Sequence, residues 1–456
     1  MHDFIPPYPE RPRQPLSAIA TLRLARRNFL AIWEDRCFEW EVFSSRLLAR
    51  SLFVCNSPDT VTSAFVEHHD SFERKSPQMR HGLAPLLGDG LFISDGDTWR
   101  RRRRIVAPIV HISRMPLFAP IMVQTACETA ARWSGLAQGS PINALTEMAT
   151  LTAEVICRTV FGRQLGAAQA AEIIAAFSEY QRLVGQLDIV YFFGLPDWLP
   201  RFHSPAIRRA ATRLHKVLDR VIRDCRKRLS EGEASIIRLL LEARDSETGE
   251  PLDGTALRNE AAVIFLAGHE TTANSLAWTW YLLSQAPEIE ERLHAELAQV
   301  LAGRPPSLDD IANLPYTRAV FEETLRLYPP VPLLARQALR DETIRGRPVA
   351  AGSLVMVVPW LLHRHRKFWG KPDHYIPERF LPENAQFRVR HAYLPFSVGP
   401  RICAGAAFGQ TEAILCLATL AQRVRLRLAP GTAVEPVCRL TLRPGDDLRM
   451  LLYSRD

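Results

Sequence analysis

The sequence predicts a mainly α-helical protein with a smaller β-sheet region, folded as one domain over residues 1–456. Three observations lead to this prediction. Segments with apolar residues at helical spacing recur along the chain, strand-like segments are few and short, and no linker or repeat divides the sequence. The composition, with 47% hydrophobic and 23% charged residues, is ordinary for a soluble globular enzyme. We expect residues 1 to about 75 to join the sheet elements near 343–358 in a β-rich lobe.

The expected helices begin at capping signals and end at glycines. Ser57 followed by Pro58 is a helix start of this kind. Apolar residues at helical spacing also fill residues 141–162, 167–185 and 287–303, and each of these segments stops at a glycine.

Strand signals are few, and one stretch has no periodic pattern. The expected strands lie at residues 38–42, 52–55, 343–358, 440–442 and 448–452. Between Asp188 and Ser204 the chain is aromatic and rich in proline. A membrane-facing loop, a substrate-gating loop and a plain connection between helices are all open there.

Charge and cysteine usage limit the class of protein. The net charge of +8 is a mild excess, which favours an acidic protein partner or an anionic cofactor over nucleic acid. The eight cysteines form no C-x-x-C pair, as in a cytoplasmic protein whose thiols stay reduced. The N-terminus lacks the pattern of a signal peptide, and no run of apolar residues is long enough for a membrane span. An N-terminal segment that rests on a membrane surface stays an alternative.

One cysteine lies in a loop with unusual chemistry. Cys403 is bracketed by Gly399 and Gly405, and a helical pattern follows at once. A cysteine just before a helix is placed where backbone N–H groups and the helix dipole stabilise a thiolate. Arg401 adds positive charge, and Phe396 can shield the sulfur. The loop suits a thiolate metal ligand, although a buried structural cysteine is an equal alternative from this loop alone.

The spacing F-x-x-G-x-R-x-C-x-G, from Phe396 to Gly405, resembles the haem-binding signature of the cytochrome P450 family. One departure is Ser397, where that family most often has glycine. The resemblance implies a cytochrome P450 fold with haem b, iron protoporphyrin IX, between a long central helix and this loop. Cys403 is then the axial ligand of the haem iron, and Gly405 lets the flat cofactor approach the backbone.

Two further motifs extend the resemblance. Glu323 and Arg326 form the family's E-x-x-R, and Arg379 lies in the later P-E-R-F segment. The resemblance implies that these three residues form a structural triad, because buried charges persist only when they are paired and hydrogen-bonded.

Near the N-terminal end, Trp99 and Arg103 match a W-x-x-x-R pair that binds a haem propionate in the family. Arg401 and Arg336 match further propionate ligands, since a guanidinium can bind a carboxylate through two hydrogen bonds. The other arginines of the 100–104 run are expected on the cysteine side of the protein, where an acidic electron donor could dock.

The stretch "FLAGHETTANSL", residues 265–276, contains the first half of a zinc-protease pattern, but position 273 is alanine. The family resemblance gives this stretch another meaning, as the motif A-G-x-[DE]-T-T above the haem. Ala267 and Gly268 then leave room for dioxygen, Thr271 hydrogen-bonds the dioxygen, and Glu270 relays protons from solvent. His269 is expected to be structural.

The resemblance implies a prokaryotic-type monooxygenase that inserts one oxygen atom from dioxygen into a lipophilic small molecule, such as a terpenoid, a steroid, a fatty acyl chain or an aromatic. A separate electron donor, a ferredoxin or a flavodoxin with its reductase, and a monomeric state are expected. The alternatives are a peroxide-driven peroxygenase, a non-catalytic haem-binding sensor and a zinc hydrolase. Glu270 with Thr271 argues against the first, because peroxide-driven relatives typically lack this pair.

The substrate pocket is placed by the resemblance alone. Its expected lining is almost wholly apolar, as is usual for a substrate bound mainly by burial. The expected lining residues are Leu83, Leu91, Phe92, Val263, Phe265, Ala267, Val331, Leu333, Leu334, Leu440 and Thr441.

Overall fold

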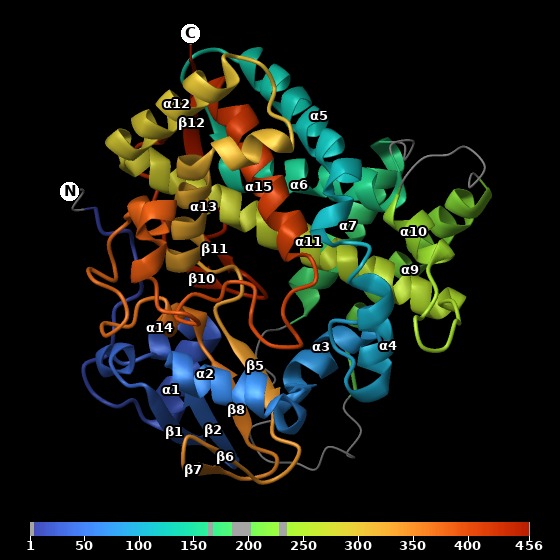
Figure 1. The fold of residues 1–456 in the computed structure, drawn as a ribbon, viewed down its shortest axis with the longest axis vertical. Coiled ribbons are helices and arrows are strands. Elements are labelled where there is room, and N and C mark those ends of the chain that lie inside the picture. Colours follow the sequence, from blue (N-terminus) through green and yellow to red (C-terminus); the bar gives the residue numbers. More distant parts are fainter. Residues whose placement is uncertain (1–3, 163–166, 185–201, 228–234, 456) are drawn as a thin grey trace.

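A body of helices packs against a sheet-containing end in this computed structural model (Figure 1), which describes residues 4–162, 167–184, 202–227 and 235–455. The mainly helical fold with a smaller sheet region is therefore as predicted. The stretch from Asp188 to Ser204, for which the sequence leaves three interpretations, lies largely outside the described residues. Within the described ranges, no helix has the length and apolar character needed to cross a membrane.

The helices begin and end where local signals place them. Ser57 caps α2, with Pro58 in its first turn, and Gly162 ends α6. The bounds are α1 Ala18–Arg27, α2 Pro58–Thr62, α3 Pro77–Leu87, α4 Gly96–Val106, α5 Met115–Ser134, α6 Ala144–Phe161, α7 Ala167–Leu183, α9 Pro205–Lys227, α10 Ile236–Glu242, α11 Gly254–Gln285, α12 Pro287–Leu301, α13 Pro315–Leu327, α14 Pro359–Leu362 and α15 Ala406–Ala421.

The largest sheet has the strand order β1-β2-β8-β5-β3. Its strands β2 and β8 run parallel, and its other neighbours are antiparallel. The strand bounds are β1 Val42–Leu47, β2 Arg50–Cys55, β3 Arg74–Lys75, β4 Ser140–Asn143, β5 Leu334–Gln337, β6 Glu342–Ile344, β7 Arg347–Val349, β8 Leu354–Val357, β9 Val424–Leu428, β10 Val437–Cys438, β11 Leu442–Arg443 and β12 Arg449–Ser454. Strands β4, β12 and β9 form a second sheet, while β6–β7 and β10–β11 are hairpins.

One predicted strand was wrong and others were shifted. Residues 38–42 do not form a strand, because Asp35–Phe38 is a short 3-10 helix and β1 begins only at Val42. The predicted strand at 343–358 is three strands, β6, β7 and β8, separated by turns. The prediction at 440–442 falls on the β10–β11 turn, where only Leu442 is in a strand.

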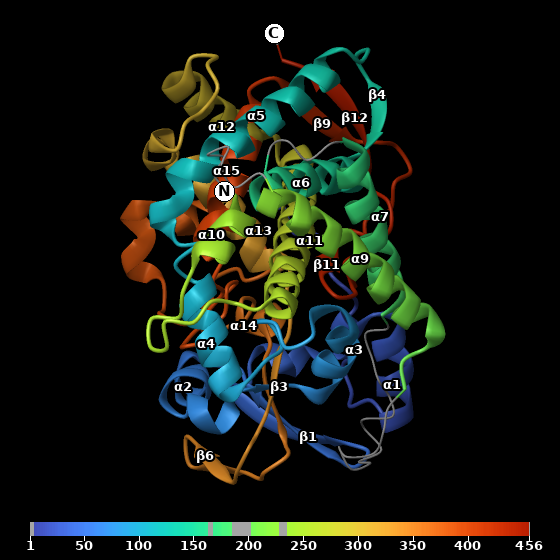
Figure 2. The same cartoon turned by 90° about the vertical axis from the view of Figure 1, so that its right-hand side faces the viewer.

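Helix α11 runs through the middle of the protein, beside α6 and α13 (Figure 2). It is continuous from Gly254 to Gln285, and the Asp253 side chain caps it by accepting a hydrogen bond from the Ala256 N–H. Most of its residues are buried on every side, as expected for a core helix. Ala267 is an exception, because this small apolar residue is exposed in the middle of a buried helix.

Candidate active site

The Cys403 loop is held by its own backbone. The Cys403 N–H donates to the Phe396 carbonyl at 2.9 Å, and the Ile402 N–H donates to the Gly399 carbonyl at 3.0 Å. Helix α15 starts directly after Gly405. These bonds fix the thiol three residues before a helix N-terminus, and the Cys403 side chain has accessible surface there.

Two positions of this loop have left-handed backbone. Gly399 has φ +74°, and a Cβ built on it would lie 2.0 Å from the Phe65 carbonyl oxygen, so only glycine fits. Ser397 has φ +66°, a conformation that costs an L-residue about 1–2 kcal/mol. The departure from glycine noted at Ser397 therefore has a conformational cost.

Replacing Ser397 with glycine is expected to raise the free energy of unfolding by about 0.5–1 kcal/mol, because relief of the left-handed strain exceeds the added freedom of the unfolded chain. Urea unfolding followed by circular dichroism measures the change. The matched control is Ser45→Gly on the exposed edge strand β1, which should destabilise the protein. Equal destabilisation by both changes would contradict the strain argument.

Burial raises the pKa of the Cys403 thiol, and the Gly405 N–H, Arg103 and Lys75 oppose this shift. The thiolate expected from the sequence is the metal-bound sulfur, whereas this raised pKa belongs to the free thiol. A metal ion on the sulfur would displace the proton, as coordinated thiols are deprotonated outright.

Two buried guanidinium groups lie beside the cysteine loop. Arg401 donates to the Ser94 carbonyl at 2.7 Å and lies over the Trp99 ring at 4.7 Å. Arg336, on β5, lies over the Phe65 ring at 3.7 Å, and burial together with Arg401 lowers its pKa to about 9. These two cations therefore lie close enough to repel each other.

Lys75 is a site residue that the sequence reasoning missed. It lies opposite Arg336 in the β3–β5 pair, and burial, Arg401 and Arg336 lower the pKa of its ammonium group well below the usual value. Its field reaches Cys403 as well. The short strand β3 carries no sequence signal of its own, so the pairing with Arg336 could not be foreseen.

The residues present fit a haem with two carboxylate groups. Trp99 and Arg103 lie one turn apart on α4, and the charge of Arg103 also reaches Cys403. The Nη1 atom of Arg401 is buried and has no hydrogen-bond partner within the described parts of the chain. Clustered, desolvated cations of this kind are stabilised by anions, and two propionates would supply them.

The rest of the arginine run is engaged with this chain's own carboxylates. Arg100 pairs with Glu73 and Asp97, and Arg101 pairs with Glu250. The pairs of the last two arginines are Arg102 with Asp89 and Glu260, and Arg104 with Asp245 and Glu247. These pairs fasten α4 to neighbouring segments, and Arg100 and Arg101 stay 44% and 38% exposed, so the docking of an acidic electron donor stays a prediction.

The middle of α11 presents small and hydroxyl-bearing residues. Thr271 lies one turn after Ala267, and its hydroxyl donates to the Ala267 carbonyl at 2.6 Å. Gly268 has a different role from the expected one, because a Cβ there would lie 2.8 Å from Ile156 of α6. Its small size permits close packing of α6 and α11, and the helix is not interrupted at this point.

The neighbouring His269 is a structural residue, as expected. Its Nε2 lies 3.1 Å from the Ala149 carbonyl of α6, and its own carbonyl accepts from Thr152 at 3.0 Å. Among the described residues, no three His, Cys, Asp or Glu side chains converge as a set of metal ligands.

Glu270 is held on both sides. Its Oε1 accepts from Arg443 Nη2 at 2.6 Å, and its Oε2 accepts from Gln181 Nε2 at 2.7 Å. The carboxylate thus points toward α7 and β11. The sequence resemblance implied a proton-relay role for Glu270 but gave no indication of its two hydrogen-bond partners.

Glu323, Arg326 and Arg379 come together as expected from the resemblance. Arg326 binds Glu323 through two hydrogen bonds of 2.6 and 2.7 Å, and neither side chain is exposed. Arg379 Nε lies 3.4 Å from Glu323 Oε1. Arg326 also donates to the carbonyls of His363, Pro372 and His374.

The buried imidazole of His363 links this triad to the segment that precedes the Cys403 loop. Its Nε2 accepts from the Leu394 N–H at 2.9 Å, so its Nδ1 carries the proton that is donated to the Arg326 carbonyl at 3.2 Å. Burial lowers the His363 pKa to about 3, which keeps the ring neutral. The next two residues of the chain, Arg364 and His365, are buried with it.

The expected substrate residues divide into two groups. Phe265 does not belong to the lining, because it is fully buried and stacks on Phe177 of α7 at 4.2 Å. Two residues along a helix are about 200° apart, so Phe265 and Ala267 cannot share a face. Burial alone does not decide membership of the lining, since Leu83, Leu91, Val263 and Thr441 are all buried. The remaining residues stay as predictions: Leu83, Leu91, Phe92, Val263, Ala267, Val331, Leu333, Leu334, Leu440 and Thr441.

A buried carboxyl lies on α15, behind the cysteine loop. Glu412 is fully buried, and burial raises its pKa to about 8, while the nearby Thr272 hydroxyl opposes the shift. A raised carboxyl pKa stabilises the protein below about pH 4.5, and this contribution is lost as pH rises through about 8.

Glu412→Gln should therefore become progressively more stable than the unmodified protein between pH 5 and 8, by about 1.4 kcal/mol per pH unit. Urea unfolding at several pH values measures this difference. The same change at the exposed Glu383 is the control and should leave the pH dependence unaltered. Parallel stability curves for Glu412→Gln and the parent would refute the argument.

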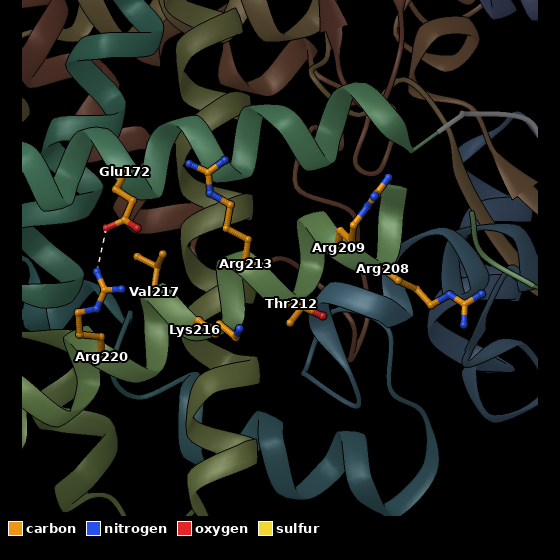
Figure 3. A pocket seen from close by; sticks show the side chains of 8 residues that line it. All are labelled: Glu172, Arg208, Arg209, Thr212, Arg213, Lys216, Val217 and Arg220. Carbon is orange, nitrogen blue, oxygen red and sulfur yellow. Dashed lines mark hydrogen bonds and ion pairs between the residues drawn. The ribbon is translucent and has the colours of Figure 1, made fainter. Parts of the chain in front are cut away.

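A separate hollow of about 440 Å³ lies on the surface between α7 and α9 (Figure 3). Its lining residues are Glu172, Arg208, Arg209, Thr212, Arg213, Lys216, Val217 and Arg220. The Arg220–Glu172 ion pair, at 3.0 Å, connects the two helices. Its basic lining distinguishes this hollow from the apolar pocket that the sequence predicts.

A thiol before a helix, a cluster of desolvated cations and a small-residue face of a core helix together define a haem-thiolate class of protein. The chain belongs to the cytochrome P450 family, because the sequence model of that family, Cytochrome P450, matches residues 17–446. It is thus a cytochrome P450 monooxygenase that uses haem b, dioxygen and a redox partner to oxygenate a lipophilic small molecule.

Individual relatives agree with this assignment. The chain is 34% identical to cyclooctatin synthase of Streptomyces melanosporofaciens over 90% of this chain and 88% of that protein. It is 34% identical to cyclooctat-9-en-7-ol 5-monooxygenase of the same organism, over 76% and 75%. The crystal structure of the cytochrome P450DA heme domain superposes with a TM-score of 0.81 at 25% identity, covering 99% and 97% of the two chains. The Streptomyces relatives support the prokaryotic-type assignment.

Proposed function

We propose that this enzyme hydroxylates a cyclic terpenoid, with electrons from a separate ferredoxin. The observation that carries the substrate class is the kinship with two Streptomyces proteins, one of which is named for oxygenating cyclooctat-9-en-7-ol at carbon 5. That name describes a cyclic, unsaturated alcohol. The apolar character of the expected lining supports the proposal, because such a substrate would bind mainly through burial of its hydrocarbon surface.

In this proposal Cys403 would hold the haem iron through its thiolate, and Arg103, Arg336, Arg401 and Lys75 would bind the propionates. Haem b held by a cysteine thiolate supplies the chemistry that activates dioxygen, since the thiolate favours cleavage of the O–O bond. Without an anion, these positive charges are buried beside one another, which is unfavourable. The propionate carboxylates would pair with them through charge-assisted hydrogen bonds.

On the α11 side of the site, opposite the Cys403 loop, the protein's own residues would control the supply of protons. Each turnover consumes two electrons and two protons, which leave as water with the second oxygen atom. The Thr271 hydroxyl, now bonded to the Ala267 carbonyl, would donate to or accept from a water at this point of α11. Glu270 would exchange protons with the α7 side of the protein. The helix holds both groups in neighbouring positions.

The test is a titration of the ferric protein with cyclic terpenoid alcohols, steroids and fatty acids, read at the Soret band. Displacement of water by cyclic terpenoids should shift the spin state from low to high. Leu440→Trp should weaken this shift. The matched control is Leu339→Trp, which alters an exposed leucine outside the expected lining and should leave the shift unchanged. A response confined to fatty acids or steroids would overturn the terpenoid assignment.

Two variants test the assigned roles with the same compounds. Cys403→Ser should lose the red-shifted band that carbon monoxide gives with a thiolate-ligated haem. Thr271→Ala should divert electrons from product to peroxide or water. Retention of the band in the first variant, or unchanged coupling of electron use to product in the second, would remove that residue from the mechanism.

A further inference from the structure

One face of α11 is fastened to the β10–β11 hairpin. Glu270, Asn274 and Trp278 occur at intervals of four along the helix, so they share a face. Their side chains hydrogen-bond Arg443, the Thr441 hydroxyl at 2.8 Å and the Leu442 carbonyl at 3.4 Å, respectively. Figure 2 shows β11 beside α11. The hairpin is therefore positioned directly by the helix that carries the acid and the threonine.

Only part of the hydrogen-bonding capacity of Arg443 is used in this arrangement. Its Nη2 binds Glu270 at 2.6 Å, whereas its Nε is buried and has no hydrogen-bond partner within the described ranges. The Arg443 side chain is 22% exposed, whereas the Glu270 side chain is only 9% exposed. If the ion pair opens, water can reach the guanidinium, and the buried carboxylate keeps the hydrogen bond from Gln181.

The same hairpin reaches the segments expected to border the substrate. The Arg439 N–H bonds the Thr441 carbonyl at 3.0 Å, which places the half-buried Leu440 at the tip of the turn. The Leu442 N–H bonds the Pro330 carbonyl at 2.9 Å, next to the Val331–Leu334 segment. A molecule that presses on Leu440 or on this segment would thus move the strand that carries Arg443.

We propose that Arg443 is a positioning residue that holds Glu270 away from the reaction until a substrate moves the β10–β11 hairpin. This inference rests on the proposed function. With the ion pair closed, both oxygens of Glu270 accept hydrogen bonds, from Arg443 and Gln181. With the pair open, Glu270 takes a proton from water on the α7 side and passes it toward Thr271, and the carboxylate is regenerated. Substrate binding and proton supply are then linked through one hairpin.

The test compares Arg443→Leu, Arg443→Lys and Arg439→Leu, all on the hairpin. Arg439 pairs with Asp446 within the same segment and not with an acid of α11, so it is the matched control. Substrate-free consumption of electrons, supplied by a surrogate ferredoxin and reductase, should rise about tenfold or more in Arg443→Leu, as expected when a general acid is no longer restrained. Arg443→Lys and Arg439→Leu should stay near the parent.

A second readout does not depend on turnover. Hydrogen exchange of the hairpin peptide 436–447 should change in the parent when a spin-shifting terpenoid binds, and α7 around Gln181 should respond with it. In Arg443→Leu the hairpin should still respond, but the response near Gln181 should be lost. Gln181→Leu, which removes the other hydrogen bond from Glu270, should raise idle electron use to a smaller extent and covers the case in which Arg443→Leu does not fold.

The outcomes separate this inference from the proposed function. Unchanged idle electron use in Arg443→Leu and Gln181→Leu would overturn the inference, as would a decrease, since a decrease would make Arg443 part of the proton path itself. Absence of any spin shift with cyclic terpenoids in the parent would instead remove the substrate assignment. The comparison of idle electron use needs no substrate and would stand in either case.

Discussion

Replacing Arg326 with leucine should cost at least about 4 kcal/mol of stability, enough to prevent accumulation of folded protein. The change leaves the Glu323 carboxylate buried with only the Ile376 N–H at 2.8 Å and the more distant Arg379. It also removes the donors from three backbone carbonyls. An uncompensated buried charge and several unsatisfied acceptors act in the same direction.

The same helix supplies the control. Arg318 pairs with Glu322 at 3.0 Å on α13, but its side chain is 54% exposed and Glu322 keeps a second cation, Arg388, at 3.8 Å. Arg318→Leu should therefore change stability by less than about 1 kcal/mol. Soluble yield and urea unfolding measure both variants. The double change Glu323→Leu with Arg326→Leu should recover part of the loss, because two apolar residues replace the unpaired charge. Equal effects of Arg318→Leu and Arg326→Leu would show that burial of the pair contributes nothing.

The features predictable from sequence were those decided by near neighbours in the chain. The Ser57 cap, the Gly162 stop and the Cys403 loop each depend on a few adjacent residues, and the structure has them where they were expected. The E-x-x-R pair is local as well, since helical geometry brings residues three apart together.

What could not be predicted depends on residues distant in sequence. The carboxylates that engage the arginine run lie up to 158 positions away, as for Arg102 with Glu260. The two partners of Glu270, Arg443 and Gln181, are 173 and 89 residues away. No periodicity indicates such pairs, because ion pairing across a fold is set by tertiary packing. Phe265 differs from these cases, because helical geometry alone excludes it from the face of Ala267.

Gly399→Ala should prevent formation of the haem loop. The new methyl group would lie 2.0 Å from the Phe65 carbonyl oxygen and 3.0 Å from its carbon, and these backbone atoms cannot move aside as a flexible side chain could. The φ of +74° adds a further penalty of about 1 kcal/mol or more for any L-residue. Relief therefore requires displacement of residues 396–405 from the Ser63–Glu67 helix, and Cys403 moves with them.

The expected phenotype is local, because the loop contributes little to the main helical core. Gly399→Ala should retain most of its far-ultraviolet circular dichroism and lose haem or the thiolate-type carbon monoxide band. Gly370→Ala is the matched control, since a methyl group there meets no atom within 4 Å and its backbone is not left-handed. Gly405→Ala distinguishes the requirement for a folded loop from the requirement for space beside the haem. Its methyl group also meets no protein atom, so the protein should fold as stably as the parent while haem binds less tightly. A normal carbon monoxide band in Gly399→Ala would show that the loop can leave Phe65 and still present Cys403, and the glycine would then serve the fold alone.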